Sequence, residues 1–405
     1  MIRVREFEME KDLKTVEELE RRCDVGPMVD VGGTKKENEK KEKKKKKSLS
    51  IFVDLLGDPL SQVRHCPDHV MLVAEWGEKK EMVGVIRACI KMVTRGKDSI
   101  YVKVAYILGL RVSPHHRRLG IGTKLVEGAE WWSAARGAEY AYMATDGANA
   151  ASINLFTGRL AYARFRSPAL LAHPVHAHRL PLSSSDTVLH LPPRAAAALY
   201  ERIFPPSAVE FLPADFPALL SHPLTIGTFL AVPSSSAAGA GVAAGEVPAT
   251  SFAVMSLWDS TRVLRLRVAG APAAARAALA VLRAVDGGAP WLRVPSVRDF
   301  FRPFGVYLMY GLHMSGREGP RLMRRLCRVA HNAAVSDGNC AAVVAEVGPG
   351  DPVRAAVPYW KRFSYDEDVW CMKRLLGHSD GVGVGDDWLA AQPATEVIFV
   401  DPREF

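Results

Sequence analysis

The sequence predicts a mixed α/β fold, in which antiparallel strands and a parallel crossover share one sheet. Three apolar runs, 70–76, 82–92 and 102–112, follow one another with only short polar connections, which is typical of an antiparallel meander. The third run leads into a Gly-containing turn and then into apolar residues at helical spacing up to about residue 135. A further apolar run at 138–145 completes a strand–helix–strand crossover, so the same sheet gains a parallel pair.

The elements on either side of this unit extend the sheet. Residues 2–7 predict a short first strand, and 10–22 predict a helix with acidic residues in its first turn. After the crossover, 149–160 predict a helix and 162–166 predict a last strand. The first domain is therefore expected to span residues 1–167.

Length and charge indicate a globular protein of more than one domain. The chain has 405 residues, of which 48% are hydrophobic and 24% charged, enough for two or three domains with cores. The net charge is +9, but the tract 35–47 holds nine Lys and three Glu, so most of the excess lies there. Like charges without an apolar face cannot pack, and we expect 32–48 to be a disordered insertion. The alternative is an import signal or a nucleic-acid contact, although direct nucleic-acid binding is not favoured because the rest of the chain is nearly neutral.

Cysteine spacing and hydropathy indicate the compartment. The six cysteines are scattered without Cys-x-x-Cys spacing, which favours reduced thiols over disulfides or a zinc site. There is no apolar run of about 18 residues, and the charged first strand does not resemble a signal peptide. We therefore expect a protein of the cytosol or nucleus without a membrane partner.

The segment with the clearest chemistry follows the strand at 102–112. It has the pattern Arg117-x-x-Gly120-x-Gly122 and opens a helix. Glycines at these positions let backbone amides approach a ligand, and the helix N-terminus favours an anion such as a pyrophosphate. The spacing is neither that of a Walker loop nor that of a dinucleotide fingerprint. An ordinary tight strand-to-helix turn is the alternative interpretation.

This strand–loop–helix resembles the acyl-CoA-binding motif of the GNAT superfamily of N-acetyltransferases, whose pattern is Arg/Gln-x-x-Gly-x-Gly/Ala. A second block, from Asn149 to Tyr162, is similar to the family's Asn-x-x-Ala-x-x-Leu-Tyr followed by Gly-Phe. The resemblance covers residues 1–166 and implies the GNAT acyl-CoA N-acyltransferase fold, with acetyl-CoA as cosubstrate and no metal. Strands that splay beside Val112 would expose peptide groups that an extended pantetheine arm can satisfy. The cofactor-binding residues that the resemblance implies are Leu110, Val112, Arg117, Arg118, Leu119, Gly120, Ile121, Gly122, Thr123 and Asn149.

The sequence does not identify the catalytic residues. Acetyl transfer to an amine needs a base for an ammonium proton, and often an acid for the leaving thiolate. Phe156 stands where many relatives carry an acidic tyrosine, and the strand at 102–112 has no Asp or Glu. Tyr106 stands about where some relatives place a glutamate base. The candidates are therefore Tyr106, Glu75, Asp146, His115 and His116, with solvated or strand-edge roles as the alternative.

The second half of the chain repeats this order of elements. A strand at 305–310, a Gly-containing turn at 315–320, a helix at 322–335 and a strand at 341–347 predict a second, degenerate GNAT-like lobe. Pro320 removes an amide donor from its turn, so CoA binding there is not expected.

The division that follows has four parts. We expect a GNAT domain at 1–167, a linker at 168–200, the degenerate lobe at 201–376 and a tail at 377–405. The linker histidines His173, His176 and His178 lack nearby carboxylates or cysteines in the sequence, so no metal site is assigned.

Segments of the second half extend the resemblance to the plant hookless-type N-acetyltransferases. They are 291–297, 301–305 and 319–321, read together with the first lobe. This resemblance implies a nuclear or nucleocytoplasmic acetyltransferase in a growth-regulatory, hormone-linked context, with a histone or other protein lysine among the amine acceptors. A non-catalytic acyl-CoA-binding regulator with the same fold is the alternative, because Phe156 and the missing acid argue against catalysis.

Overall fold

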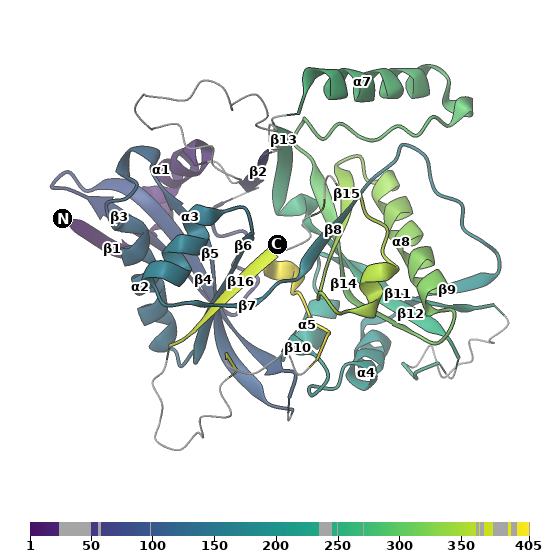
Figure 1. Cartoon of the computed structure of the whole chain (residues 1–405), viewed down its shortest axis with the longest axis horizontal. Coiled ribbons are helices and arrows are strands. Elements are labelled where there is room, and N and C mark those ends of the chain that lie inside the picture. The colour runs from purple at the N-terminus through teal and green to yellow at the C-terminus, as the bar shows by residue number, and fades with distance from the viewer. Residues whose placement is uncertain are drawn as a thin grey trace, which may run out of the picture.

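A computed structural model describes residues 1–23, 50–55, 58–97, 99–234, 245–248, 250–269, 271–361, 364, 368–375, 388–389 and 395–404. Two sheets lie side by side, each with its own helices (Figure 1). The predicted lysine-rich insertion at 32–48 lies outside the described residues, as does most of the predicted tail.

The first sheet has the strand order β1-β3-β4-β5-β6-β16-β7, and β10 pairs with the outer part of β4. Its strands β3, β4 and β5 form the predicted antiparallel meander, and β5 and β6 form the predicted parallel pair. The strands are β1 (Ile2–Glu6), β3 (Asp68–Trp76), β4 (Glu81–Arg95), β5 (Tyr101–Val112), β6 (Tyr140–Asp146), β7 (Ala163–Arg166), β10 (Glu210–Pro213) and β16 (Asp368–Arg374).

Helices cover both faces of this sheet. The crossover helix α2 (Ile121–Ala134) buries Leu125, Val126, Ala129 and Trp132, the residues whose spacing predicts its apolar face. On the other face, α1 (Met9–Arg22) packs Val16 and Leu19 against β3 and β4. Each buried side chain of this size contributes about 1.5–3 kcal/mol of transfer free energy, so the crossover is held firmly on the sheet.

The helix predicted at 149–160 has two parts. It consists of α3 (Ala150–Ile153) and the π-helical turn η2 (Asn154–Arg159), which places Phe156 in the core. A π-turn inserts one residue per turn and is not visible in apolar spacing.

The second sheet has the order β8-β15-β14-β12-β11-β9, with a parallel β14–β15 pair that matches β5–β6 of the first sheet. Helix α8 (Gly319–Ser336) packs on one face, while α4 (Pro193–Ile203) and α5 (Phe216–Leu220) pack on the other. The strands are β8 (Ala169–Pro174), β9 (Asp186–Leu191), β11 (Thr225–Pro233), β12 (Phe252–Asp259), β14 (Gly305–Ser315) and β15 (Cys340–Val347). The second α/β lobe that the sequence predicts is present.

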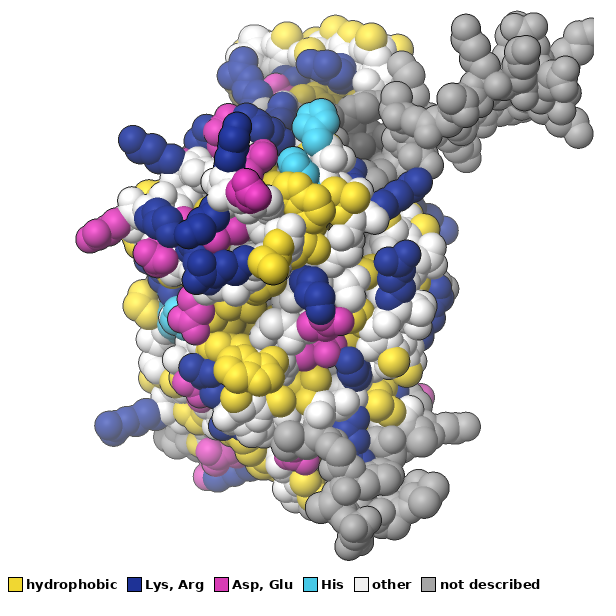
Figure 2. Space-filling model, turned by 90° about the vertical axis from the view of Figure 1, so that its left-hand side faces the viewer, with side chains coloured by type: hydrophobic (Ala, Val, Ile, Leu, Met, Phe, Trp, Pro, Cys, Tyr) yellow, Lys and Arg dark blue, Asp and Glu magenta, His cyan; other side chains and the backbone are white. Residues whose placement is uncertain are grey.

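The remaining elements lie at the edge of the two lobes. β2 (Ser50–Leu55) pairs with β13 (Leu264–Ala269), and α7 (Ala273–Gly288) stands apart from both sheets at the top of Figure 1. The end of the molecule formed by the first lobe carries basic and acidic side chains interspersed with one another (Figure 2).

The two lobes exchange strands across the predicted boundaries. Strand β8 follows β7 directly in the chain but pairs with β15 of the second sheet. Strand β16, near the other end of the chain, pairs with β6 and β7 of the first sheet. The predicted linker at 168–200 therefore holds β8, β9 and part of α4, and the predicted lobe at 201–376 donates β10 and β16 to the first sheet. Alternating apolar residues predict that a strand exists, but they do not determine with which distant strand it pairs.

Buried ion pairs fix this exchange. Arg166 at the end of β7 donates to both carboxylate oxygens of Glu210 on β10, at 2.7 and 2.6 Å. Arg403 donates to Asp215 at 2.6 Å and to Asp401, which also lies 3.8 Å from Lys91 of β4. The C-terminal residues 395–404 are thereby held between the lobes.

Candidate active site between the two lobes

The parallel strands β5 and β6 separate halfway along their length. They pair only from Val104–Tyr140 to Tyr106–Tyr142, although β5 continues to Val112 and β6 to Asp146. Beyond Tyr106 the facing peptide groups of the two strands therefore do not pair with each other. This is the opening that the sequence predicts beside Val112, and an extended ligand can enter it as an added strand.

A bulge in β5 shapes this opening. The register with β4 shifts between Val85–Arg111 and Arg87–Leu108, and Gly109 within the shift has φ +63°. The guanidinium of Arg87 fills the space where a side chain at 109 would stand, and it donates to the carbonyl of Pro59 at 2.5 Å and to Glu20. Bulges of this kind re-aim a strand beside a site.

The start of α2 lies at the mouth of the same opening. Gly120 has φ +82° and caps the helix, and the first intrahelical hydrogen bond runs from the amide of Lys124 to the carbonyl of Gly120. The amides of Ile121, Gly122 and Thr123 precede that bond and have no acceptor one turn earlier in the helix. Together with the helix dipole, they form an anion site.

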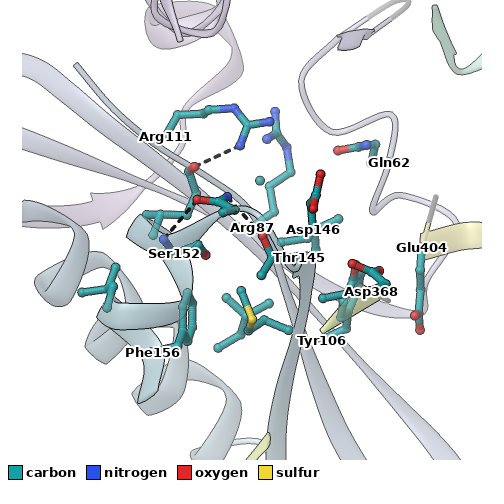
Figure 3. Close-up of a pocket in the computed structure, with 18 of the residues that line it drawn as sticks. Gln62, Arg87, Tyr106, Arg111, Thr145, Asp146, Ser152, Phe156, Asp368 and Glu404 are labelled. Carbon is teal, nitrogen blue, oxygen red and sulfur yellow. Dashed lines mark hydrogen bonds between the residues drawn. The ribbon is translucent and has the colours of Figure 1, made fainter. Parts of the chain in front are cut away.

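One cavity of about 940 Å³ joins these features. Of the ten residues that the resemblance implies for the cofactor, nine line it; Leu119 does not and is half exposed. Figure 3 shows Arg87 and Arg111 on one side of the opening and Ser152 and Phe156 on the other. Asn149 accepts from the amide of Ser152 at 3.2 Å and donates to Thr145 at 3.1 Å, so its amide caps α3.

Comparison with known proteins identifies the architecture. Residues 45–162 match the model of the acetyltransferase (GNAT) family. The chain is 56% identical to acetyl transferase GW6a of Oryza sativa subsp. japonica, over all of this chain and 98% of that protein. It is 45% identical to the probable N-acetyltransferase HLS1 of Arabidopsis thaliana, over 99% of both chains. The chain belongs to the GNAT acetyltransferase family.

Solved structures with a similar fold are more distant in sequence. One is an N-myristoyltransferase of Saccharomyces cerevisiae with bound myristoyl-CoA, at a TM-score of 0.47 and 10% identity over 92% of this chain and 79% of that one. Another is a GCN5-related N-acetyltransferase of Anabaena variabilis, at a TM-score of 0.46 and 8% identity over 93% and 73%. Family membership makes the GNAT protein described here an acyltransferase.

The second lobe closes the far side of the GNAT cavity. Its lining includes Leu308, Met309 and Tyr310 of β14 and Glu346 of β15, and the exchanged strand β16 adds Asp368 and Trp370. Sequence analysis did not single out Glu346 or Asp368. A signal was available in the first case, because Glu346 is the only charged residue of the apolar run 340–347.

Two of these carboxyl groups, those of Glu346 and Asp368, have raised pKa values. Burial, and then the charge of Asp368, raise the pKa of Glu346 to about 8. Burial raises the pKa of Asp368 to about 6, with Asp146 adding to the effect. Titratable groups with such shifts gather at functional sites, although structural networks also produce them.

The predicted base candidates of this acetyltransferase divide into two groups. Tyr106 and Asp146 line the cavity, and Figure 3 shows Tyr106 near Asp368. Burial raises the pKa of Tyr106 above its ordinary range, so it is a neutral phenol at physiological pH and does not suit a base. His116 also lines the cavity, whereas His115 is exposed and does not.

Glu75 is not part of the cavity. It is buried and accepts from Arg5 at 2.7 Å, and this contact lowers its pKa. Arg5 also pairs with Asp12 of α1 at 2.6 Å. Glu75 therefore joins β1, β3 and α1, away from the cavity where the other base candidates Tyr106, Asp146 and His116 lie.

The turn of the second lobe differs from that of the first. The amide of Glu318 donates to Ser251 at 3.1 Å and that of Gly319 to the carbonyl of Gly316 at 3.0 Å. The turn does not line the large cavity. The amide donors of this turn are thus already occupied by acceptors within the protein, and Pro320 removes a further donor.

The linker histidines lie away from this site. His178 contacts Asp286 at 2.6 Å, and the rings of His173 and His176 lie within 6.0 Å of His331. In the part of the chain that the structure describes, no group of three metal-binding side chains gathers around a common point, and no helix is long and apolar enough to span a bilayer.

Proposed function

We propose that this GNAT acetyltransferase binds acetyl-CoA between β5 and β6 and transfers the acetyl group to a primary amine, with a histone or other protein lysine as the acceptor. The observation that supports this most directly is the continuity of one cavity from the separated strands to the N-terminus of α2. A pantetheine arm pairs with the peptide groups of Leu110 and Val112. The pyrophosphate then meets the amides of α2 and the charges of Arg117 and Arg118.

The residues of the opening fit this ligand. Gly120 and Gly122 leave the helix amides uncovered, and a Cβ at Gly122 would lie 3.3 Å from the side chain of Leu155. A larger side chain at 122 would reach the pantetheine path. Acetyl-CoA supplies an activated acyl carbon as a thioester, and this chain must orient it and manage the protons of the amine.

Calorimetry with CoA and mass spectrometry of acetylated products test the proposal. The panel of acceptors contains histone peptides and polyamines. Gly122→Leu is expected to abolish the heat of CoA binding and the transfer together, while Glu127→Gln, at an exposed position of the same helix, changes neither. Absence of any CoA binding by the well-folded parent protein would refute the proposal.

The same experiment addresses the alternative of a non-catalytic regulator. Phe156 cannot protonate a leaving thiolate, which is the observation behind that alternative. CoA binding without turnover on every acceptor in the panel would favour it. The nuclear location and the growth-regulatory context implied by the plant relatives remain predictions, tested by localising the full chain in plant cells.

A further inference from the structure

A half-buried glutamate of the second lobe, Glu346, lines the same cavity as the opening in the first. Glu346 lies in β15, opposite Leu170 of β8 and one residue beyond the last pair of β15 with β14, and it lines the large cavity with Asp368 and Tyr106. Among the described residues, its Oε1 is buried without a hydrogen-bond partner. The indole nitrogen of Trp370 on β16 is likewise buried without a hydrogen bond of good geometry, although it lies near enough to Glu346 to lower that residue's pKa; Trp370 is only 2% exposed.

The buried glutamates Glu210 and Glu75 show how this protein holds a carboxylate with a structural role. Glu210 receives two hydrogen bonds from Arg166 and one from Trp388 at 3.1 Å, and Glu75 receives one from Arg5. Among the residues that the structure describes, no cation bonds to Glu346, and the charged group that acts on its pKa is the acidic Asp368. A carboxyl that has one oxygen buried without a counter-charge and lies beside a second carboxyl costs stability, so its position favours a ligand that supplies positive charge.

We propose that Glu346 is the general base of acetyl transfer, and that Glu346 and Asp368 together form the site for the ammonium group of the acceptor. The inference rests on the proposed function, because it places an amine opposite the acetyl-CoA opening. It gives the second lobe a direct part in the chemistry. It also requires an acceptor that enters as a cation, which agrees with the primary amine of the proposed function.

The reaction balances with these groups alone. The acceptor enters as R–NH3⁺, and the Glu346 carboxylate takes one proton from nitrogen. The nitrogen lone pair attacks the thioester carbonyl carbon and forms the C–N bond. Collapse of the tetrahedral intermediate breaks the C–S bond, and the leaving thiolate takes a second proton from the same nitrogen. The products are the acetylamide, CoA–SH and a proton that Glu346 returns to water, so Phe156 need not supply one.

The surroundings of Glu346 set the expected pH dependence. Strand β16 presents Asp368 and the Trp370 N–H, β5 presents the neutral Tyr106, and Asp351 at the start of η5 (Pro352–Ala355) lines a smaller adjoining cavity with Glu346. On β14, Tyr310 is bonded to Thr225 at 2.9 Å. Since a base must be deprotonated, activity rises with pH through the pKa of Glu346, near 8 in the free protein.

The test compares the full chain with Glu346→Gln and with Asp259→Asn as control. Asp259 is a carboxylate of the second lobe outside the cavity, and both of its hydrogen bonds reach one oxygen that Asn retains. With acetyl-CoA and a lysine peptide, Glu346→Gln is expected to lower kcat about 100-fold or more while CoA affinity stays unchanged. Asp259→Asn keeps both, and Glu346→Asp recovers part of kcat.

Two further readouts separate a base from a structural residue. Asp368→Asn removes a charge that raises the pKa of Glu346, so the rising limb of the rate moves to lower pH. Glu346→Gln is expected to melt at a higher temperature than the parent protein at pH 8, because a carboxyl with one oxygen buried without a counter-charge is removed. Parent activity that survives in Glu346→Gln with an unchanged pH profile overturns this inference and leaves the proposed function intact. An inactive parent that binds no CoA refutes the proposed function first.

Discussion

A side chain at Gly109 would place its Cβ 2.6 Å from the Nη1 atom of Arg87. The bulge of β5 and the buried guanidinium of β4 therefore depend on each other. Arg87 fills the space beside Gly109 in the bulge, and β5 pairs with β6 only before this point of the strand.

Gly109→Ala is expected to lower the free energy of unfolding by about 1–3 kcal/mol and to weaken CoA binding, because it combines a positive φ with a clash. Gly77→Ala is the matched control, since Gly77 has a similar φ of +69° but nothing within 4 Å of its Cβ site. Denaturant unfolding and CoA calorimetry measure the two effects. Equal losses in both variants would show that Arg87 does not hold the bulge.

Glu75→Gln is expected to destabilise the protein by about 1–3 kcal/mol while kcat stays unchanged, because Glu75 serves an ion pair and not the cavity. Arg5 lowers the pKa of Glu75 below its ordinary value of 4.5. The stabilisation is therefore present above pH 4.5 and is lost as the pH falls through the lowered value. Unfolding curves of parent and variant from pH 3 to 7 should converge at the acidic end. A drop in kcat at equal stability would return Glu75 to the list of bases.

Glu210→Gln is expected to cost about 3–5 kcal/mol, because it leaves Arg166 buried without its counter-charge. Glu18→Gln breaks an exposed pair with Arg22 and should change stability by less than about 1 kcal/mol. Urea unfolding at neutral pH gives both values. If the two costs are similar, the Arg166–Glu210 pair does not fix the strand exchange.

The fragment 1–167 is expected not to form a stable monomer, because without β16 it leaves the edges of β6 and β7 unpaired. The full chain, by contrast, should be monodisperse and unfold cooperatively. Size-exclusion chromatography and circular dichroism of both proteins check this. A soluble, folded fragment would show that the first lobe does not need the exchanged strand.

Local patterns in the sequence predict most elements and the partners of strands that follow one another closely, but not the partners of strands far apart in the chain. The runs of β3, β4 and β5 and the apolar face of α2 are visible because strand and helix periods are short. The Gly120 and Gly122 turn is predictable because its chemistry lies within six residues. Glu346 and Asp368 belong to strands whose partners lie far away in the sequence. They line one cavity with Tyr106 only because of tertiary contacts, which local apolar periodicity does not predict.

The strand exchange also delays completion of the first sheet during synthesis. About 200 residues separate β7 from β16, so at roughly 5–20 residues per second the ribosome completes β16 some ten to forty seconds after β7. During that interval the unpaired edges of β6 and β7 can pair with a strand of another chain. A chaperone that binds the nascent chain would therefore protect these edges until β16 is made. A premature stop codon before β16 would leave the first sheet incomplete, although most of that sheet is encoded much earlier in the message.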